Sequence, residues 1–429
     1  MRIYSNELQG MDGKKVTIAG WLRTIRDIGK TKFLIVADRF GSVQIVVKKG
    51  EVSDDVEKKV SPLNREDVLS VSGIAKASKQ APNGIEIFPE GIEILAKAET
   101  PLPIETDERI KSNLDTRLDY RFLDLRKPEN RAVFRIKDVI QRNFVRYLEE
   151  HGFILVNTPV IVAAATEGGT DLFPISYFEK EAFLGQSPQL YKQILMASGL
   201  DKVAIIVPVF RAEEHDTSFH LNESIQMDIE TAFVKDEEDA LRYLDGVIGF
   251  IYKKVKEECK EELELLNKDL VVPELPIKRL TYDEAIAIAE KEKIKIKWGE
   301  DLTPEAQRAI CKHHNPVIIK KWPTDVRAFY AMPEPGNRKI CRGYDLLIDG
   351  VEVCSGAQRI HDYKELVDEM KRRKMNPKNF KFYLDAFRYG MPPHAGWSIG
   401  LERITMIMTG LKNIREVVLF PRDKKRLSP

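Results

Sequence analysis

Two stretches near the middle of the chain alternate apolar and polar residues with a period of two. The first runs from Val203 to Val209, and in the second Ile225, Met227 and Ile229 alternate with polar residues. Successive side chains of a β-strand point to opposite faces, so this period is typical of strands with one buried face. A polar segment separates the two stretches. The pattern therefore predicts two antiparallel strands joined by a long hairpin loop.

The predicted hairpin carries many charged side chains on one face. Strand parity places Arg211 and Glu213 together after the first strand. It also places Gln226, Asp228 and Glu230 on a single face of the return strand. Such a face is costly to bury unless its groups pair with one another or meet a ligand. The hairpin alone fits an exposed, salt-bridged ribbon and a ligand-binding sheet equally well.

The N-terminal part of the chain is predicted to form five short strands separated by turn signals such as Pro82-Asn83-Gly84. The expected strands are Val16–Leu22, Phe33–Ala37, Val43–Val47, Val68–Ala77 and Ile85–Leu95. Five short strands in so few residues suit a small closed barrel, for which the oligonucleotide-binding barrel is the common form.

One surface of this barrel has the composition of a nucleic-acid site. Arg26 is one of several cations near Phe33, and Gln44 lies on the next strand. Cations follow phosphates, an aromatic ring stacks on a base, and an amide can hydrogen-bond to a base edge. Phe33 could also belong to the barrel core, and the sequence pattern alone favours the core over a stacking role.

The rest of the chain mixes helices and strands. Apolar residues recur with helical spacing from Arg131 to Glu150, and a strand is expected from Phe153 to Pro159. Further helices are expected at Asp236–Lys268, Thr281–Glu290 and Asp362–Lys374. Together with the barrel and the hairpin, these elements predict a chain of the α+β class.

Composition narrows the possible classes. The 429 residues suggest two or three domains, and 68 Lys and Arg against 67 Asp and Glu give no basic excess that would indicate a nucleic-acid partner. The four cysteines lie far apart without a C-x-x-C pair, which argues against a zinc site or a disulfide framework. We see no signal peptide and no apolar run of transmembrane length, so a soluble cytoplasmic protein is expected.

A second hairpin is expected around the two-residue turn Asp349-Gly350. The register that this turn sets pairs Asp345 with Cys354 and puts Asp345 and Glu352 on one face as diagonal neighbours. Two carboxylates so placed can share a cation. Ser355 has the opposite parity, so it could join them only through a bend at Ser355-Gly356. Two exposed acids on a sheet edge would produce the same pattern.

Several motifs resemble those of one known family. The segment Arg211–Glu223, with its R-x-E and H-L-x-E groups, is similar to motif 2 of the class II aminoacyl-tRNA synthetases, and Gly396–Arg403, G-x-x-x-G-L-E-R, is similar to their motif 3. Glu167–Asp171 and Gln186–Gln193 resemble the aspartyl branch of that family in its archaeal and eukaryotic form. The resemblance runs from about Gly20 to Asp423.

The resemblance implies a fold and a domain plan. The fold would be α+β, with a five-stranded oligonucleotide-binding barrel for the anticodon and a class II catalytic domain built on an antiparallel sheet flanked by helices. The barrel would span residues 1–102, a hinge 103–130 and the catalytic domain 131–429. The helix and strand that end at Pro159 resemble motif 1, which implies a homodimer, although an amphipathic helix packed on its own core fits the same spacing.

The resemblance also implies an activity, the ATP-dependent ligation of L-aspartate to tRNA(Asp) through an aspartyl-adenylate, with Mg²⁺ bound to the ATP. Arg211 and Arg403 would be the catalytic residues. The residues implied at the ATP are Arg211, Glu213, His220, Leu221, Glu223, Glu352, Gly400 and Arg403, and those around the Mg²⁺ are Asp345, Glu352 and Ser355. Those implied at the aspartate are Glu167, Ser187, Gln189, Lys192, Gln226, Asp228, Arg359 and His394.

Within this implied site, Lys192 and Arg359 would grip the side-chain carboxylate of aspartate, which accepts charge-assisted bonds that an amide cannot match. The chain departs from the usual motif 2 at two positions. Phe219 stands where an arginine is common, and Ser224 stands where an aromatic residue is common. The resemblance therefore leaves the packing of the phosphates and the adenine open at these two positions.

Contacts with the tRNA anticodon are implied at Arg26, Phe33, Gln44 and Pro82. The resemblance implies that the loop containing Pro82 lies beside the third anticodon base, which is the base that differs between tRNA(Asp) and tRNA(Asn). Proline has no backbone N–H to donate, so the sequence leans towards an enzyme that charges both tRNAs with aspartate. The alternative is that Pro82 only shapes the turn and that Arg23 or Gln80 reads the base.

Three rival functions are open. An asparaginyl-tRNA synthetase shares the barrel and the motifs, but it would have no substrate carboxylate for Lys192. A relative resembling asparagine synthetase, which activates aspartate for ammonia, would not need the barrel. A regulatory or nucleic-acid-binding paralogue without catalysis would be expected to have lost Arg211, Glu352 or Arg403, and all three are present.

Overall fold

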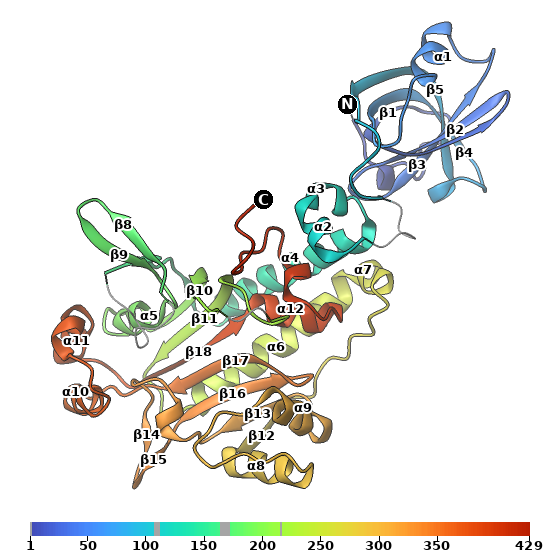
Figure 1. Cartoon of the computed structure of the whole chain (residues 1–429). Coiled ribbons are helices and arrows are strands. Elements are labelled where there is room, and N and C mark those ends of the chain that lie inside the picture. Colours follow the sequence, from blue (N-terminus) through green and yellow to red (C-terminus); the bar gives the residue numbers. More distant parts are fainter. Residues whose placement is uncertain (1, 107–111, 164–171, 215–216) are drawn as a thin grey trace. The chain divides into compact units, whose positions relative to one another are not determined.

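A computed structural model describes residues 2–106, 112–163, 172–214 and 217–429 (Figure 1). Its contacts divide the chain into two compact units, residues 1–112 and 113–429. Residues 113–130, part of the expected hinge, pack within the second unit, where Arg117 Nη1 and Arg121 Nη2 donate to Glu416. The second unit thus begins within the range expected for the hinge. A hinge over residues 103–130 stays a prediction.

The first unit is a closed barrel in the order β1-β2-β3-β5-β4, which confirms the fold predicted for this region. Its strands are β1 (Lys15–Ile28), β2 (Thr31–Ala37), β3 (Ser42–Lys48), β4 (Val68–Ala77) and β5 (Ile85–Ala96). The alternation does not predict α1 (Asp54–Val60), a short helix capped by the hydroxyl of Ser53. Val56 and Val60 of this helix join the barrel core.

The second unit is built on an eight-stranded sheet in the order β12-β13-β16-β17-β18-β11-β10-β6. Its strands are β6 (Ile154–Leu155), β10 (Lys202–Phe210), β11 (Glu223–Ala232), β12 (Lys278–Thr281), β13 (Val317–Lys320), β16 (Gly343–Ile348), β17 (Val351–Gln358) and β18 (His394–Gly400). The inner pairs are antiparallel, whereas the edge pairs β6/β10 and β12/β13 are parallel. The predicted α+β class and antiparallel sheet are confirmed.

Helices α4 (Pro128–Glu150), α6 (Glu238–Glu258) and α12 (Leu401–Thr409) share one large apolar core with this sheet (Figure 1). Phe144 of α4, for example, packs edge-on against Trp397 of β18, with ring centroids 6.3 Å apart. One face of the sheet therefore packs against these helices. Among the described helices we find none with the length and apolar character of a membrane span.

The predicted helix over residues 236–268 is interrupted. Cys259 has φ −123° and ψ 38°, which are not helical, so α6 ends before it and α7 (Lys260–Leu265) begins after it. The remaining helices are α2 (Leu114–Asp119), α3 (Arg121–Asp124), α5 (Gln189–Met196), α8 (Tyr282–Lys291), α9 (Pro304–His313), α10 (Tyr363–Arg372) and α11 (Lys381–Arg388). Two small sheets contain β7 (Ile161–Val162), β8 (Pro174–Tyr177), β9 (Lys180–Leu184), β14 (Pro333–Glu334) and β15 (Asn337–Cys341).

Strands β10 and β11 form the predicted hairpin, in which Phe210 pairs with Glu223. Met227 and Ile229 enter the apolar core, which turns the alternate residues of β11 to the other face of the sheet. β11 lies between β10 and β18 in the sheet. Asp228 on that face is only 1% exposed, so the exposed ribbon is excluded.

Strands β16 and β17 meet at the predicted turn, where Asp349 and Gly350 have φ of 52° and 75°. The predicted register holds for the first two pairs, Ile348 with Val351 and Leu347 with Glu352, but the predicted pairing of Asp345 with Cys354 is wrong. Asp345 pairs with Ser355, because a β-bulge near Val353 inserts one extra residue into β17. The extra residue moves Ser355 to the face of the sheet that carries Asp345 and Glu352, so no bend at Ser355-Gly356 is needed. Asp345, Glu352 and Ser355 therefore share one face.

Candidate active site

Two adjoining cavities lie on the face of the sheet that carries the polar residues of β11. The first cavity has a volume of about 190 Å³ and is lined by Ser187, Gln189, Lys192, Arg211, Gln226, Asp228, Arg327, Ala328, Tyr330, Ala331, Ser355, Gly356, Ala357, Arg359 and Ser398. The second has a volume of about 150 Å³ and is lined by Arg211, Glu213, Phe219, His220, Leu221, Ser224, Gln226, Glu352, Val353, Ser355, Ser398, Gly400, Glu402, Arg403 and Ile414. Their shared wall consists of Arg211, Gln226, Ser355 and Ser398.

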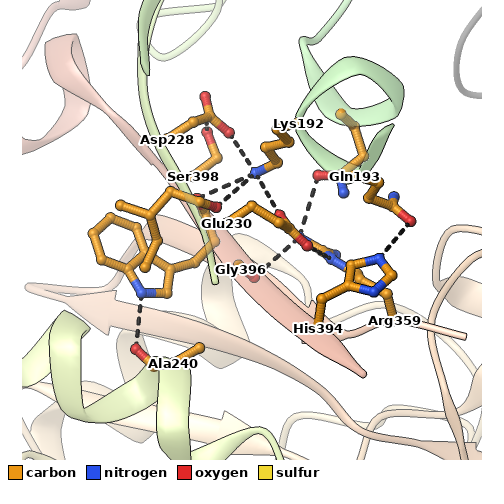
Figure 2. A network of polar contacts seen from close by, with 12 residues as sticks. Lys192, Gln193, Asp228, Glu230, Ala240, Arg359, His394, Gly396 and Ser398 are labelled. Atoms are coloured by element: carbon orange, nitrogen blue, oxygen red, sulfur yellow. Dashed lines mark hydrogen bonds and ion pairs between the residues drawn. The ribbon is translucent and has the colours of Figure 1, made fainter. Parts of the chain in front are cut away.

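Lys192, Asp228 and Arg359, which line the first cavity, belong to a buried polar network with Glu230 (Figure 2). Lys192 of α5 donates from Nζ to Asp228 Oδ1 at 2.8 Å, and the same atom lies 3.4 Å from Glu230 Oε2. Arg359 donates from Nε and Nη2 to the two carboxylate oxygens of Glu230 at 2.9 and 3.3 Å. Arg359 Nη2 also donates to Gln189 Oε1 at 3.2 Å. None of the four charged residues is more than 4% exposed.

This network holds two cations and two carboxylates, so its charges balance. Burial raises the pKa of Asp228, and the Lys192 ammonium opposes that rise. Burial would also raise the pKa of Glu230, but the Arg359 guanidinium and the Lys192 ammonium lower it overall. Nη1 of Arg359 makes no hydrogen bond with the described residues, so it is the donor available to a ligand that enters the cavity.

His394 lies behind the first cavity, so the expectation that it lines the pocket is not met. The ring is fully buried, with Nδ1 2.9 Å from the carbonyl oxygen of Pro392 and Nε2 3.2 Å from Gln193 Oε1. Burial lowers the pKa of His394 to about 4, which keeps the ring neutral near pH 7. His394 therefore contacts Gln193, the neighbour of Lys192 in α5, and does not face a ligand in the cavity.

The second cavity combines cations with a helix N-terminus. Arg403 Nη1 donates to the carbonyl oxygen of Glu352 at 2.8 Å, and Gly400 stands at the N-terminal cap of α12. Helix N-termini favour anions, since their backbone N–H groups lack intrahelical partners. His220 Nε2 lies 3.9 Å from Glu213 Oε2. These groups fit a phosphorylated ligand.

The loop after β10 is held in place by Asn222. Its Nδ2 donates to the carbonyl oxygens of Arg211 and Glu213 at 2.7 and 3.1 Å, which fixes both predicted residues at the cavities. Leu221 also lines the second cavity, and it packs in a small apolar cluster with Val133.

Glu223 does not reach either cavity. Its parity on β11 is opposite to that of Ser224 and Gln226, and it lines a separate hollow of about 500 Å³ with Phe210. Glu402 lines the second cavity without having been expected there. It accepts hydrogen bonds from Lys137 Nζ at 2.9 Å and from the backbone N–H of Ile225 at 3.0 Å.

The proposed metal ligands lie together on β16 and β17. Asp345 is 1% exposed, faces Ser355 in the register and shares its face with Glu352. Burial raises the pKa of Asp345 to about 7; Arg327 opposes the rise and the Glu352 charge adds to it. Two carboxylates and a hydroxyl form an all-oxygen donor set, which suits a hard cation such as Mg²⁺. Across the described ranges there is no cluster of three or more His, Cys, Asp or Glu residues that could hold a metal without other donors.

On the barrel, Phe33 is outside the core cluster, which excludes its assignment to the core. It pairs with Arg26 of β1, so the cation and the aromatic ring are neighbours on the outer surface. Gln44 of β3 donates to Glu86 Oε2 at 3.1 Å. Pro82 begins the 3₁₀ turn Pro82–Gly84 that leads into β5. Glu167 lies outside the described residues.

Three residues of the first cavity and its network have no role assigned from the sequence. Ser398 pairs with Asp228 across β11 and β18, and its Oγ donates to Asp228 Oδ2 at 3.3 Å. Glu230 shares the parity of Asp228, which is a usable sequence signal. Arg327 comes from a loop far from the motifs, and no local pattern indicates its position.

The chain also matches known families. The family model described as tRNA synthetases class II (D, K and N) matches residues 113–424, and the model of the OB-fold nucleic acid binding domain matches residues 16–95. The fold and the site therefore define a class II synthetase domain joined to an oligonucleotide-binding barrel. The chain belongs to the class II tRNA synthetases of the D, K and N group.

Curated relatives and solved structures are similar over nearly the full length. The aspartate–tRNA(Asp/Asn) ligase of Archaeoglobus fulgidus is 49% identical over 100% of both chains, and that of Methanocaldococcus jannaschii is 50% identical over 98% of this chain and 96% of its own. The asparaginyl-tRNA synthetase of Pyrococcus horikoshii, solved with asparaginyl-adenylate, has a TM-score of 0.95 at 34% identity over 100% of both chains. A putative aspartyl-tRNA synthetase from Leishmania major has a TM-score of 0.90 at 27% identity, over 100% of this chain and 95% of its own.

Proposed function

We propose that this protein is an aspartate–tRNA ligase that forms an aspartyl-adenylate from ATP and transfers the aspartyl group to tRNA. The observation that carries the proposal is the shared wall of the two cavities. Arg211 stands where a ligand of the first cavity meets a ligand of the second. Such an arrangement suits a reaction between an amino acid and a nucleotide. The name of the curated relatives supports aspartate as the amino acid.

The first step joins the α-carboxylate of aspartate to the α-phosphorus of ATP, and the bond to the β-phosphate breaks to release pyrophosphate. Negative charge accumulates on the phosphoryl oxygens in the transition state, so catalysis depends on positioned cations. Arg211 can stabilise that charge from the shared wall, and Arg403 can hold the outer phosphates from the second cavity. In the second step, a hydroxyl of the terminal tRNA ribose attacks the adenylate carbonyl and AMP leaves.

Selection of aspartate is assigned to the buried network of the first cavity. The Nη1 donor that Arg359 leaves for a ligand belongs to a cation, so a substrate carboxylate gains a charge-assisted hydrogen bond that a neutral amide cannot match. Arg359 Nη1 supplies a donor, and Lys192 supplies positive charge next to it. An asparaginyl enzyme would have no use for this buried ammonium, although asparaginyl-tRNA synthetases share the fold.

Mg²⁺ bound to ATP is part of the proposal, and the donor set on β16 and β17 fits it. Asp345, Glu352 and Ser355 would hold the ion together with phosphate oxygens. The ion would neutralise phosphate charge. Mg²⁺ commonly takes one or two carboxylates and completes its shell with phosphates and water, so a site with two acids is sufficient.

The tRNA partner is assigned to the barrel. Phe33 and Arg26, as neighbours on the outer surface, supply a stacking ring and a phosphate-binding cation, and Gln44 supplies a base-edge group. The relatives' name includes both tRNA(Asp) and tRNA(Asn), which supports relaxed recognition through Pro82. Aspartylation of the two transcripts tests this. A preference for tRNA(Asp) above about 10² would contradict relaxed recognition. That factor corresponds to two specific base contacts, each at the low end of about 1–3 kcal/mol.

We also propose a homodimer in the cytoplasm, where tRNA charging takes place. The edge strand β6 exposes Ile154 and Leu155 at 49% and 47%, and Ile161 of β7 is 45% exposed. A double change, Ile154→Glu with Leu155→Glu, should yield a monomer in light-scattering measurements. Phe178→Glu, at an exposed residue of the β8–β9 hairpin, is the matched control and should leave the mass unchanged.

Aspartate-dependent charging of tRNA(Asp) tests the ligase itself. The full-length protein with ATP and Mg²⁺ should attach labelled aspartate to the transcript and should not attach asparagine. Charging with asparagine in place of aspartate would assign the protein to the asparaginyl enzymes.

A further inference from the structure

Arg327 connects the first cavity with the proposed metal ligands. It lies in the loop after the 3₁₀ turn Thr324–Val326, lines the first cavity, and places Nη2 2.5 Å from Asp345 Oδ1. Its guanidinium carbon lies 4.4 Å from the ring centroid of Trp322, a cation–π distance. The side chain is only 16% exposed.

Arg373, the residue after α10, fixes the backbone of this loop through two hydrogen bonds. Arg373 donates from Nη1 to the carbonyl oxygen of Arg327 at 2.6 Å and from Nη2 to that of Thr324 at 2.7 Å. Arg373 is itself fixed by Glu369, whose Oε1 accepts from its Nε at 2.8 Å. The position of Arg327 is therefore built into the fold.

Two features separate this pair from an ordinary structural ion pair. Asp345 shares its face with Glu352 and Ser355, so it belongs to a set of oxygen donors that no ordinary ion pair requires. In addition, Nε of Arg327 is buried and has no hydrogen-bond partner in the described part of the chain. A buried donor without a partner is costly, and that cost is removed when a ligand or a rearrangement supplies an acceptor.

We infer that Arg327 is a positioning residue that neutralises Asp345 while the metal site is empty and is displaced from it when a divalent cation binds. Mg²⁺ lies about 2.0–2.1 Å from its oxygen ligands, so the ion and the Arg327 nitrogen cannot both approach Oδ1 so closely. The displaced guanidinium stays in the wall of the first cavity, where an anionic group of the amino acid is its next partner. Metal binding and amino-acid binding are then coupled through one side chain.

Direct measurement of metal binding tests this inference without catalysis. Mn²⁺ serves as the probe, and free Mn²⁺ is followed by electron paramagnetic resonance with the full-length protein and no nucleotide. Arg327→Met should bind Mn²⁺ at least tenfold more tightly than the wild type, because a competing cation is removed. Arg327→Lys keeps the charge and should stay within threefold of the wild type. Arg279→Met is the control, since the Arg279 side chain is 21% exposed and pairs with Asp245 at 2.7 Å outside both cavities.

A second background separates competition for Asp345 from a general effect of charge. In Asp345→Asn, the additional change Arg327→Met should leave Mn²⁺ affinity unchanged. Equal affinity of Arg327→Met and the wild type would overturn the inference, and so would a gain that persists in Asp345→Asn. If Arg327→Met does not fold in thermal melts, Arg327→Gln decides by the same criteria.

This inference rests on the proposed metal site but not on the choice of amino acid. If neither the wild type nor Arg327→Met binds Mn²⁺ without nucleotide, this inference is wrong, because Arg327 then has no cation to compete with at Asp345. The proposed ligase activity would still be decided separately by aspartate-dependent charging of tRNA.

Discussion

Lys192→Met removes the ammonium from the buried network and keeps a side chain of similar length. In the wild type, Nζ lies 2.8 Å from Asp228 Oδ1 and 3.4 Å from Glu230 Oε2. After the change, two buried carboxylates share the single guanidinium of Arg359. The pKa of Asp228, already raised by burial, should rise further, because Lys192 is the cation that opposes the rise.

Two effects of Lys192→Met can be given magnitudes. Removing one partner of a buried ion pair typically costs about 3–5 kcal/mol of stability. A charge-assisted hydrogen bond is worth about 1.5–3 kcal/mol, which converts to a loss of roughly ten- to a hundredfold in the preference for aspartate over asparagine. Activity with aspartate should fall strongly, because its carboxylate loses this cation, whereas activity with asparagine should fall less, because its amide never gained from the ammonium.

The assay is ATP–pyrophosphate exchange, with kcat/KM measured for aspartate and for asparagine in parallel. Lys202→Met is the control, since Lys202 lies on β10 outside both cavities and donates to the carbonyl oxygen of His151. Thermal melts establish that each variant is folded. An unchanged ratio of the two kcat/KM values in folded Lys192→Met would refute the role of this residue in selecting the carboxylate.

Three further outcomes are expected. Arg211→Ala should lower pyrophosphate exchange by at least about a hundredfold, the usual cost of one transition-state donor, and near-normal exchange by a folded variant would contradict its role. Phe33→Ala should weaken tRNA charging by about 1–3 kcal/mol and leave exchange intact, and an equal fall of both would mean that the ring only supports the fold. Burial depresses the pKa of His394 from 6.5 to about 4. The unfolded chain therefore binds an extra proton between these values, and about 3 kcal/mol of stability should be lost as the pH falls through that window. Denaturant titrations should find this loss removed in His394→Gln but kept in a variant of the exposed His313.

The sequence could predict the parts of the site that follow from strand periodicity. Alternation along β11 placed Gln226, Asp228 and Glu230 on one face, and the Asp349-Gly350 turn placed Asp345 beside Glu352. Period-two alternation fails wherever a strand contains an inserted residue. The β-bulge in β17 inserts one residue before Ser355 and so changes the face on which Ser355 lies.

Other features depend on contacts between distant segments. Arg327 reaches Asp345 from a loop that no motif marks, and His394 lies behind the cavity because Pro392 and Gln193 bind its ring. The role of Glu230 as the partner of Arg359 follows only from the hydrogen bond between them, which the strand pattern does not predict. Local pattern gives the face of a residue, whereas its partner is decided by tertiary packing.

Amino-acid-dependent ATP–pyrophosphate exchange by the wild-type protein is the most direct test of the proposed ligase. The shared wall at Arg211 and the buried Lys192 lead us to expect exchange that depends on aspartate and exceeds that with asparagine by a factor of about 10⁴, as in sites whose buried polar groups reject a mismatched analogue. Exchange that depends on asparagine, or no exchange with either amino acid by the folded protein, would contradict the account.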